Sequence, residues 1–378
     1  MKICNVVGAR PQIIKAAALS RVIKESFNNE IEDIIIHTGQ HYDLNMSEVF
    51  FNEMEIPLPT ENLGIGSASH SIQTAKMLEK IEQVFIKYNP DIVVLYGDTN
   101  STLAASISAI KMNIPVAHIE AGLRSFNKKM PEEINRIVCD HSSTLLFSPT
   151  ITGLKNLQNE GFHLDSTPPY SSDNPAVFLS GDIMYDNSLF YRDKAFRLSN
   201  IIEKLKLNDK KIVLATIHRN TNTDEPNRLK DILEKLNAIA TQTNYSVVFP
   251  IHPRTKKLIK EFDLAYLLQN IIVIEPLSFF DMIVMENYAS LILTDSGGVQ
   301  KEAYFYHKPC IIMRQETEWI EILQAGAGAL EPQNIDEFIS LVNKFINHPP
   351  TIFPAYFGNG HTAQYICEKL LLFNNLKS

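Results

Sequence analysis

A short run of small residues is the part of this sequence best suited to hold an anion. Residues 294–298 read Thr-Asp-Ser-Gly-Gly, follow an apolar run at 289–293, and precede a helical pattern that begins at Val299. Free N–H groups and the dipole at a helix start favour a phosphate. Glu302, one turn into this helix, is placed to reach a sugar hydroxyl. An ordinary strand-to-helix connection with an Asp or Ser cap explains the same residues equally well.

Three acidic residues in the first half of the chain are spaced for acid–base chemistry. Asp98 and Glu120 each follow a short apolar run, and Glu132 lies in the first turn of a predicted helix. Crowded carboxyl groups raise each other's pKa, which keeps one of them available as an acid while another acts as a base. A lone acid more often caps a helix or pairs with a cation such as Arg124 or Arg136. Three acids at predicted strand ends favour the catalytic interpretation.

Two basic residues add positive charge at the start of the chain. Arg10 follows the first predicted strand, 3–7, and Lys15 lies about one turn into the helix that opens at Pro11. Ligands of open α/β sheets bind at the carboxyl ends of the strands. A cation near a helix N-terminus opposes the helix dipole, so the placement favours a bound anion over a merely solvated charge.

Two patterns in the sequence partly match a metal site and a dinucleotide-binding motif, but neither match is complete. His37 and His41 are four residues apart, but Gly39 between them breaks the helical geometry of a metal-binding pair. The nearest match to a dinucleotide fingerprint, at 358–363, lies at the C-terminus with no room for a following βαβ unit. We therefore predict no metal and no cofactor.

Composition sets the broad class of the protein. A length of 378 residues predicts two domains, and a hydrophobic fraction of 45% with 21% charged residues is typical of a soluble globular protein. The net charge of −8 argues against a broad nucleic-acid surface. The apolar run at the N-terminus is too short to predict a signal peptide, and because no apolar run approaches about 18 residues, no membrane span is expected. Four scattered cysteines without a Cys-x-x-Cys motif indicate a reducing, cytoplasmic setting.

Strand and helix patterns alternate along the whole chain, which predicts a mostly parallel sheet in each half. Strands are predicted at 3–7, 32–37, 91–96, 116–119, 212–216, 246–250, 271–274, 289–293 and 310–313, and helices at 45–53, 71–88 and 361–372. A Ser-, Pro- and Asp-rich loop at 165–175 indicates a domain boundary. We expect an α/β protein with a Rossmann-like domain at 1–170, a second at 171–357 facing it across a cleft, and a helix at 358–378 packing back on the first.

Seven motifs occur in one order along the chain. They are Gly8-Ala9-Arg10-Pro11-Gln12 with Lys15, Thr38-Gly39-Gln40-His41, Tyr96-Gly97-Asp98-Thr99, His118-Ile119-Glu120-Ala121-Gly122-Leu123-Arg124, Pro131-Glu132-Glu133-x-Asn135-Arg136, Thr216-Ile217-His218-Arg219, and Thr294-Asp295-Ser296-Gly297-Gly298-x-Gln300-x-Glu302. With these motifs the chain resembles the non-hydrolysing UDP-N-acetylglucosamine 2-epimerase family over nearly its whole length.

The resemblance implies a GT-B fold, a UDP-sugar substrate, a homodimer and no redox cofactor. It implies that Asp98, Glu120 and Glu132 carry the acid–base chemistry, with His218 close by. The predicted substrate-binding residues are Arg10, Lys15, Gln40, His41, Arg136, Arg219, His252, Ser296, Gly297, Gly298, Glu302 and Arg314. Neither a nucleic acid nor a membrane is expected as a partner.

Three positions depart from the family pattern. Gln12 and Trp319 stand where many relatives have Glu and Arg, and Lys301 replaces a common acid. These variants resemble a branch that acts on UDP-2,3-diacetamido-2,3-dideoxy-glucuronate, so the sugar is either this uronate or N-acetylglucosamine.

The chemistry explains why several acids and an anion site are needed together. The C2–H bond of an amino sugar is not adjacent to a carbonyl, so a lone carboxylate cannot readily remove its proton. Departure of UDP leaves a cationic C1, which makes the C2 proton acidic and leads to a glycal. Readdition on the opposite face then inverts C2. A hydrolysing epimerase, a GT-B glycosyltransferase and a non-catalytic sugar-nucleotide sensor remain as alternatives.

Overall fold

The computed structural model describes residues 1–39 and 57–377. Gln40, His41 and the predicted helix at 45–53 lie outside these described residues. The chain forms two compact units, the first built from Met1–Asn187 and Ala355–Ser378 and the second from Ser188–Pro354. We expected the first change of domain near residue 170, whereas the units divide after Asn187, inside helix α7 (Ile183–Leu198).

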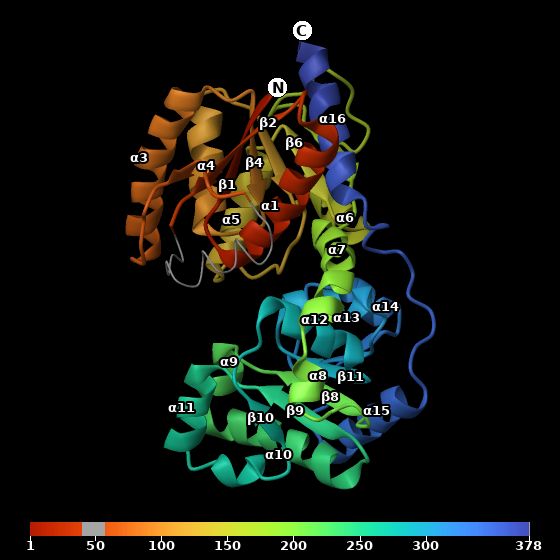
Figure 1. Cartoon of the computed structure of the whole chain (residues 1–378). Coiled ribbons are helices and arrows are strands. Elements are labelled where there is room, and N and C mark those ends of the chain that lie inside the picture. The colour runs from red at the N-terminus through yellow and green to blue at the C-terminus, as the bar shows by residue number, and fades with distance from the viewer. Residues whose placement is uncertain (40–56, 378) are drawn as a thin grey trace. The chain divides into compact units, whose positions relative to one another are not determined.

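A parallel sheet forms the centre of the first unit (Figure 1). Over the described residues its strand order is β3-β2-β1-β4-β5-β6-β7. The strands are β1 (Lys2–Val7), β2 (Glu32–His37), β3 (Glu61–Asn62), β4 (Ile92–Tyr96), β5 (Val116–Ile119), β6 (Leu145–Ser148) and β7 (Ala176–Leu179). The helices are α1 (Arg10–Val22), the π-helix η1 (Ile23–Phe27), α3 (His70–Tyr88), α4 (Asn100–Lys111), α5 (Pro131–His141), α6 (Ile151–Asn159) and α16 (Thr362–Lys377).

Continuous apolar runs explain why the middle strands of this sheet are buried. All five residues of β4 are buried, as are all four of β5, because helices cover both faces of a parallel sheet. Met77 and Ile81 of α3 join Val93 and Leu95 of β4 in one core cluster. The last paired residues of β4 and β5 are Tyr96 and Ile119. The loops carrying Asp98 and Glu120 therefore leave the sheet side by side.

The second unit repeats the same architecture around another parallel sheet. Over the described residues its strand order is β10-β9-β8-β11-β12-β13. The strands are β8 (Ile212–Thr216), β9 (Ser246–Pro250), β10 (Ile272–Ile274), β11 (Leu291–Thr294), β12 (Cys310–Ile312) and β13 (Gly328–Leu330). The helices are α8 (Ile201–Lys204), α9 (Asn220–Thr223), α10 (Pro226–Gln242), α11 (Pro253–Glu261), the 3₁₀ helix η2 (Ala265–Leu268), α12 (Phe279–Tyr288), α13 (Gly297–Phe305), α14 (Ile320–Gln324) and α15 (Ile335–Asn347).

Each sheet has a switch point, where successive strands stop adding on one side and begin adding on the other. It lies between β1 and β4 in the first unit and between β8 and β11 in the second. Loops that leave a switch point diverge and open a crevice, which is where doubly wound sheets bind ligands. Arg10 and Asp98 follow the two switch-point strands of the first unit, and His218 and Ser296 follow those of the second.

The C-terminal segment returns to the first unit. Helix α16 packs against α1. Its start is held by Asp186 of α7, whose carboxylate accepts hydrogen bonds from the backbone N–H groups of Thr362 at 3.1 Å and Ala363 at 2.7 Å. The first unit is therefore complete only when the last residues of the chain are in place.

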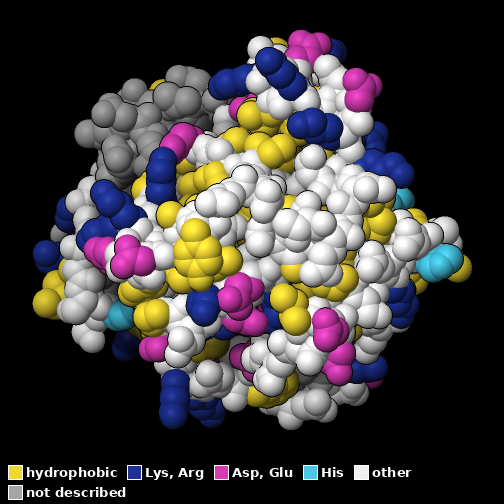
Figure 2. All heavy atoms as spheres, turned by 90° about the horizontal axis from the view of Figure 1, so that it is seen from below, with side chains coloured by type: hydrophobic (Ala, Val, Ile, Leu, Met, Phe, Trp, Pro, Cys, Tyr) yellow, Lys and Arg dark blue, Asp and Glu magenta, His cyan; other side chains and the backbone are white. Residues whose placement is uncertain are grey.

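The surface mixes charges of both signs. Figure 2 shows basic and acidic side chains interspersed with hydrophobic and uncharged ones on the face it presents. This face thus lacks the single-sign basic field typical of a nucleic-acid surface. No helix within the described ranges has the length and apolar character needed to cross a membrane.

Candidate active site

Two carboxyl groups meet at the carboxyl edge of the first sheet. Asp98 follows β4 and Glu120 follows β5. Glu120 has a φ of +76°, an uncommon conformation for a residue with a side chain. Its N–H and that of Ala121 both donate to the carbonyl of Phe147 at 3.0 Å, which holds the backbone in this strained turn. The ammonium of Lys15 forms an ion pair with Glu120.

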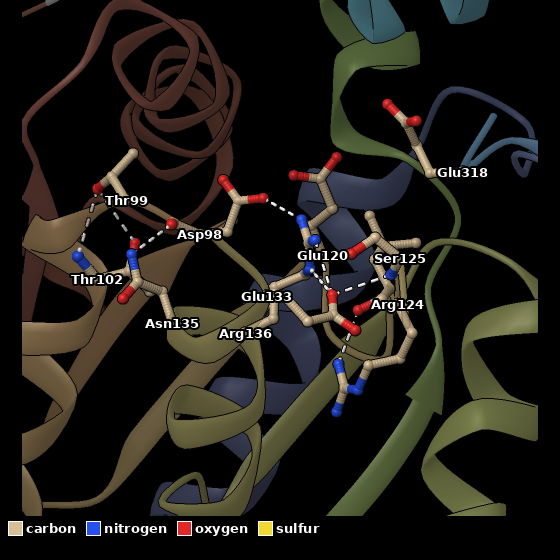
Figure 3. A network of polar contacts seen from close by, with 12 residues as sticks. Asp98, Thr99, Thr102, Glu120, Arg124, Ser125, Glu133, Asn135, Arg136 and Glu318 are labelled. Carbon is tan, nitrogen blue, oxygen red and sulfur yellow. Dashed lines mark hydrogen bonds and ion pairs between the residues drawn. The ribbon is translucent and has the colours of Figure 1, made fainter. Parts of the chain in front are cut away.

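Asp98 belongs to a network that runs through Arg136 to Glu133 (Figure 3). Nη1 of Arg136 pairs with Asp98, and its Nη2 donates to Glu133 at 2.8 Å. The buried carboxylate of Glu133 also accepts hydrogen bonds from the N–H groups of Ser125 at 2.9 Å and Phe126 at 2.8 Å. We predicted Arg136 as a substrate-binding residue, and in the structure its guanidinium binds two acids of its own unit.

The charge on Asp98 is tuned by these neighbours. Desolvation raises the pKa of Asp98 most strongly, Arg136 and Lys15 lower it, and Glu120 and Glu132 raise it, with a net shift above the ordinary value. The side chain nevertheless keeps 35% of its surface accessible, so it remains reachable from solvent. Glu132 lies in the exposed first turn of α5. The three predicted acids therefore share one edge of one sheet and influence each other electrostatically.

The Arg136→Gln variant tests this tuning, and we expect it to move the ionisation of Asp98 to higher pH. Arg136 lowers the pKa of Asp98, so its removal leaves the groups that raise this pKa less opposed. The limb of the kcat–pH profile that reports Asp98 should shift upward in pH. Arg197→Gln, an exposed site on α7, is the control and should leave the profile unchanged. A limb that stays in place or moves to lower pH contradicts the network.

In the second unit, Asp295 holds the loop that carries His218. The carboxylate of Asp295, fully buried at the end of β11, accepts hydrogen bonds from the N–H groups of His218 at 3.1 Å and Arg219 at 3.0 Å. The Nδ2 group of Asn222 donates to the same carboxylate at 2.9 Å. Nδ1 of His218 lies 3.3 Å from Asp295, and half of the His218 side chain is exposed. Asp295 thus orients the imidazole of His218 on one side, and the other side of the ring is accessible to solvent.

The turn at Ser296, Gly297 and Gly298 leads directly into helix α13, which is the arrangement predicted for an anion site. Ser296 is the N-cap, and its hydroxyl accepts a hydrogen bond from the N–H of Val299 at 3.5 Å. A Cβ at Gly297 would lie 2.3 Å from Oε1 of Glu318, so a larger residue here would displace the end of that side chain. Gly298 follows in the first turn of the helix. Backbone N–H groups at this N-terminus suit a diphosphate.

Glu302 lies beside a second, fully buried acid that sequence reasoning missed. Glu286 of α12 is 1% exposed and forms a hydrogen bond with Glu302 of α13. Burial first, and then the charge of Glu302, raise the pKa of Glu286 well above its ordinary value. Glu286 is therefore the protonated partner and donates to Glu302. In the sequence, Glu286 could have been noticed because it directly follows the apolar stretch Met282-Ile283-Val284-Met285.

The remaining predicted binding residues of this unit follow neighbouring strands. Arg219 is the N-cap of α9, and His252 is the N-cap of α11, where its Nδ1 accepts from the N–H of Arg254 at 3.3 Å. Arg314 follows β12 and donates to Glu318 at 2.9 Å. Arg10, in the first unit, is the exposed first residue of α1.

The departures from the family pattern are buried packing residues. Lys301 lies over the ring of Trp319, 4.3 Å from Nζ to the centroid, and both side chains are buried. The Gln12 amide accepts from the N–H of Gly8 at 2.9 Å and donates to the carbonyl of Tyr96 at 2.7 Å. These contacts favour internal packing for Trp319 and Gln12 over direct contact with a sugar.

Metal-binding arrangements are not seen in the described ranges. Within residues 1–39 and 57–377, no group of three or more His, Cys, Asp or Glu side chains is placed to hold a metal ion. The four cysteines are buried as free thiols.

Two units, each built on a parallel sheet flanked by helices, are the architecture of the GT-B fold. The family model described as UDP-N-acetylglucosamine 2-epimerase matches residues 24–371. A UDP-N-acetylglucosamine 2-epimerase homolog of Methanococcus maripaludis is 45% identical over 375 residues, covering 98% of this chain and 99% of the relative. The UDP-2,3-diacetamido-2,3-dideoxy-D-glucuronate 2-epimerase of Pseudomonas aeruginosa is 42% identical over 371 residues, covering 98% and 99%.

A solved structure gives the same result. The Methanocaldococcus jannaschii UDP-GlcNAc 2-epimerase, in complex with UDP-GlcNAc and UDP, matches with a TM-score of 0.85 at 40% identity, covering 98% of this chain and 100% of that one. The chain belongs to the UDP-N-acetylglucosamine 2-epimerase family, has its GT-B fold and is an enzyme. The resemblance drawn from the seven motifs is thereby confirmed.

Proposed function

We propose that this enzyme inverts C2 of a UDP-bound N-acetyl amino sugar without net hydrolysis. It interconverts UDP-N-acetylglucosamine and UDP-N-acetylmannosamine, or the corresponding gluco and manno forms of UDP-2,3-diacetamido-2,3-dideoxy-glucuronate. The observation that carries the proposal is the cluster of Asp98, Glu120 and Glu132 at one sheet edge, with Lys15 and Arg136 as counterions. Elimination and readdition need proton-transfer groups for two faces of the sugar, and a single carboxyl would not suffice.

The proposed reaction has two balanced halves. The C1–O bond breaks, UDP leaves with the bonding electron pair, and a carboxylate takes the proton from C2, which leaves a C1–C2 double bond. A second acid then adds a proton to C2 from the opposite face while a phosphate oxygen of UDP reattaches to C1. No atom is gained or lost overall.

The second unit supports the leaving group in this proposal. The N–H groups at the start of α13, behind Ser296, receive the diphosphate. Glu302 receives ribose hydroxyls, and His218 lies near the phosphates, oriented by Asp295. Arg10, Arg219, His252 and Arg314 supply further contacts. From the family resemblance we further propose that Gln40 and His41 contribute to the site, and that the enzyme is a cytoplasmic homodimer with no cofactor.

Turnover of both candidate UDP-sugars in deuterated water tests the proposal. We expect one deuterium at C2 of the epimerised product, because the proton lost from one face is not the one returned to the other. Proton NMR and mass spectrometry of the recovered UDP-sugars provide the measurement, and the preferred sugar is the one with the higher kcat/KM.

Three outcomes would count against this function. Steady accumulation of UDP and free sugar would identify a hydrolysing epimerase instead. Sugar transfer only after addition of an acceptor would identify a glycosyltransferase. Product with the original hydrogen retained at C2 would exclude exchange through an open glycal intermediate.

A further inference from the structure

A buried histidine lies beneath the turn that carries Asp98, and the proposed chemistry does not use it directly. His118, on β5, is 0% exposed. Its Nε2 lies 2.8 Å from the carbonyl oxygen of Gly97, and its Nδ1 lies 2.6 Å from Oδ1 of Asp140. A carbonyl oxygen only accepts hydrogen bonds, so Nε2 carries a proton.

The second ring nitrogen is protonated because Asp140 is held as a carboxylate. Oδ2 of Asp140 accepts from the N–H of Gly122 at 3.1 Å and lies 2.7 Å from Nη1 of Arg124. Two donors, one of them cationic, favour the ionised form, and Oδ1 then accepts from Nδ1 of His118. Both ring nitrogens thus donate, which makes His118 an imidazolium.

The electrostatics agree with this geometry. Burial alone lowers the pKa of His118, but the interactions with Cys139 and Asp140 outweigh it, so the pKa of His118 lies well above its ordinary value. The pKa of Asp140 is lowered, because His118 and Arg124 outweigh the effect of its burial. Arg124 is itself paired with Glu160, at 2.6 Å from Nε.

His118 and Asp140 contact the backbone next to two of the proposed catalytic acids, Asp98 and Glu120. The carbonyl of Gly97 immediately precedes Asp98, and the N–H of Gly122 lies two residues after Glu120. Both glycines have positive φ, +60° and +81°, so each turn is a special conformation that needs support. A Cβ at Gly122 would lie 2.4 Å from the carbonyl oxygen of Gly153, so only glycine fits at this position.

We propose that His118 is a positioning residue that stays protonated at neutral pH and, with Asp140, fixes the two turns that present Asp98 and Glu120 to the substrate. The inference deepens the proposed function and rests on it for its kinetic consequence. A charge-assisted hydrogen bond to the Gly97 carbonyl is stronger than a neutral one and holds the turn more tightly.

The charge state can be tested without any assay of activity. In full-length enzyme labelled with ¹⁵N-histidine, both ring nitrogens of His118 should resonate as protonated at neutral pH, although free histidine titrates near pH 6.5. The His118→Gln spectrum assigns the signals. A single protonated nitrogen at neutral pH, or titration in the ordinary range, overturns the proposal even if the enzyme proves not to be an epimerase.

Asp140→Asn tests the positioning role. Asparagine can retain every hydrogen bond, because its carbonyl accepts from Gly122 and Arg124 and its amide donates to a neutral imidazole. We expect kcat to fall roughly 100-fold, as for a catalytic group displaced by about 1 Å, while the Kd for UDP stays within about twofold. The His118 ring should then show one unprotonated nitrogen.

Asp33→Asn is the matched control. Asp33 is a partly buried acid near the start of β2 in the same sheet, bonded to Asn5 and Ser20, and its neutralisation should leave kcat unchanged. An Asp140→Asn enzyme with wild-type kcat overturns the positioning role. If that variant does not fold, the wild-type ring spectrum together with His118→Gln, which should lower kcat but not UDP affinity, still decides the proposal.

Discussion

Replacing any one of the three acids by its amide should lower kcat by at least about 100-fold and leave the affinity for UDP nearly unchanged. Asp98→Asn, Glu120→Gln and Glu132→Gln keep the size of each side chain but remove its capacity to take up a proton. A 100-fold loss corresponds to about 2.7 kcal/mol of transition-state stabilisation. UDP affinity should be preserved because none of the three acids is among the residues proposed to hold the UDP. Steady-state kinetics and calorimetric titration with UDP separate the two effects.

The control for these variants is Glu82→Gln, an exposed acid of α3 outside the seven motifs. It should leave kcat at the wild-type value. Glu120→Gln removes the partner of a buried lysine, since the Lys15 side chain is only 9% exposed, so its thermal unfolding must be measured alongside. A folded amide variant with wild-type kcat would remove that acid from the mechanism.

Glu302→Ala should weaken UDP binding by about 1–3 kcal/mol, the cost of losing a charged hydrogen bond. That range corresponds to roughly a 5- to 150-fold rise in the Kd measured by calorimetry. The physical reason is that Glu302 is held by protonated Glu286 and presents its carboxylate to the ribose hydroxyls in the proposed complex. An unchanged Kd for UDP in the Glu302→Ala variant would contradict the proposed contact between Glu302 and the ribose.

Glu286→Gln provides a matched comparison for this experiment. The amide of glutamine can still donate a hydrogen bond to Glu302 without any ionisation, so UDP affinity should remain near the wild-type value. A large loss of affinity in Glu286→Gln would mean that Glu286 is ionised and holds the site in another way.

Sequence reasoning located the elements of this fold well where strand and turn signals coincide. The strands at 116–119, 212–216 and 246–250 match the structure residue for residue, because continuous apolar runs end in polar turns there. Short edge elements such as β3 and β13, of two and three residues, have no comparable signal. Their place in the sheet depends on neighbours that are distant along the chain.

The closeness of Asp98 and Glu120 could be predicted because each follows a strand, and parallel strands end at one sheet edge. The partners that hold those acids could not. Asp140 lies 22 residues from His118, and Glu133 differs from Glu132 only in which side of α5 it occupies. Asp295 was one of two candidate helix caps in the alternative interpretation of its turn, whereas in the fold it accepts hydrogen bonds from the loop after β8. Such roles depend on tertiary contacts that spacing does not encode.

The return of α16 to the first unit sets an order for biosynthesis. The second unit is a continuous stretch, Ser188–Pro354, whereas the first needs both Met1–Asn187 and the residues from Ala355 onward. Domains fold as units while the ribosome delivers the chain from its N-terminus. The second unit therefore has its full complement of residues before the first unit, whose helix α1 must wait for α16. A nascent chain arrested before residue 362 would carry a complete second unit and a first unit with part of its core still open to water.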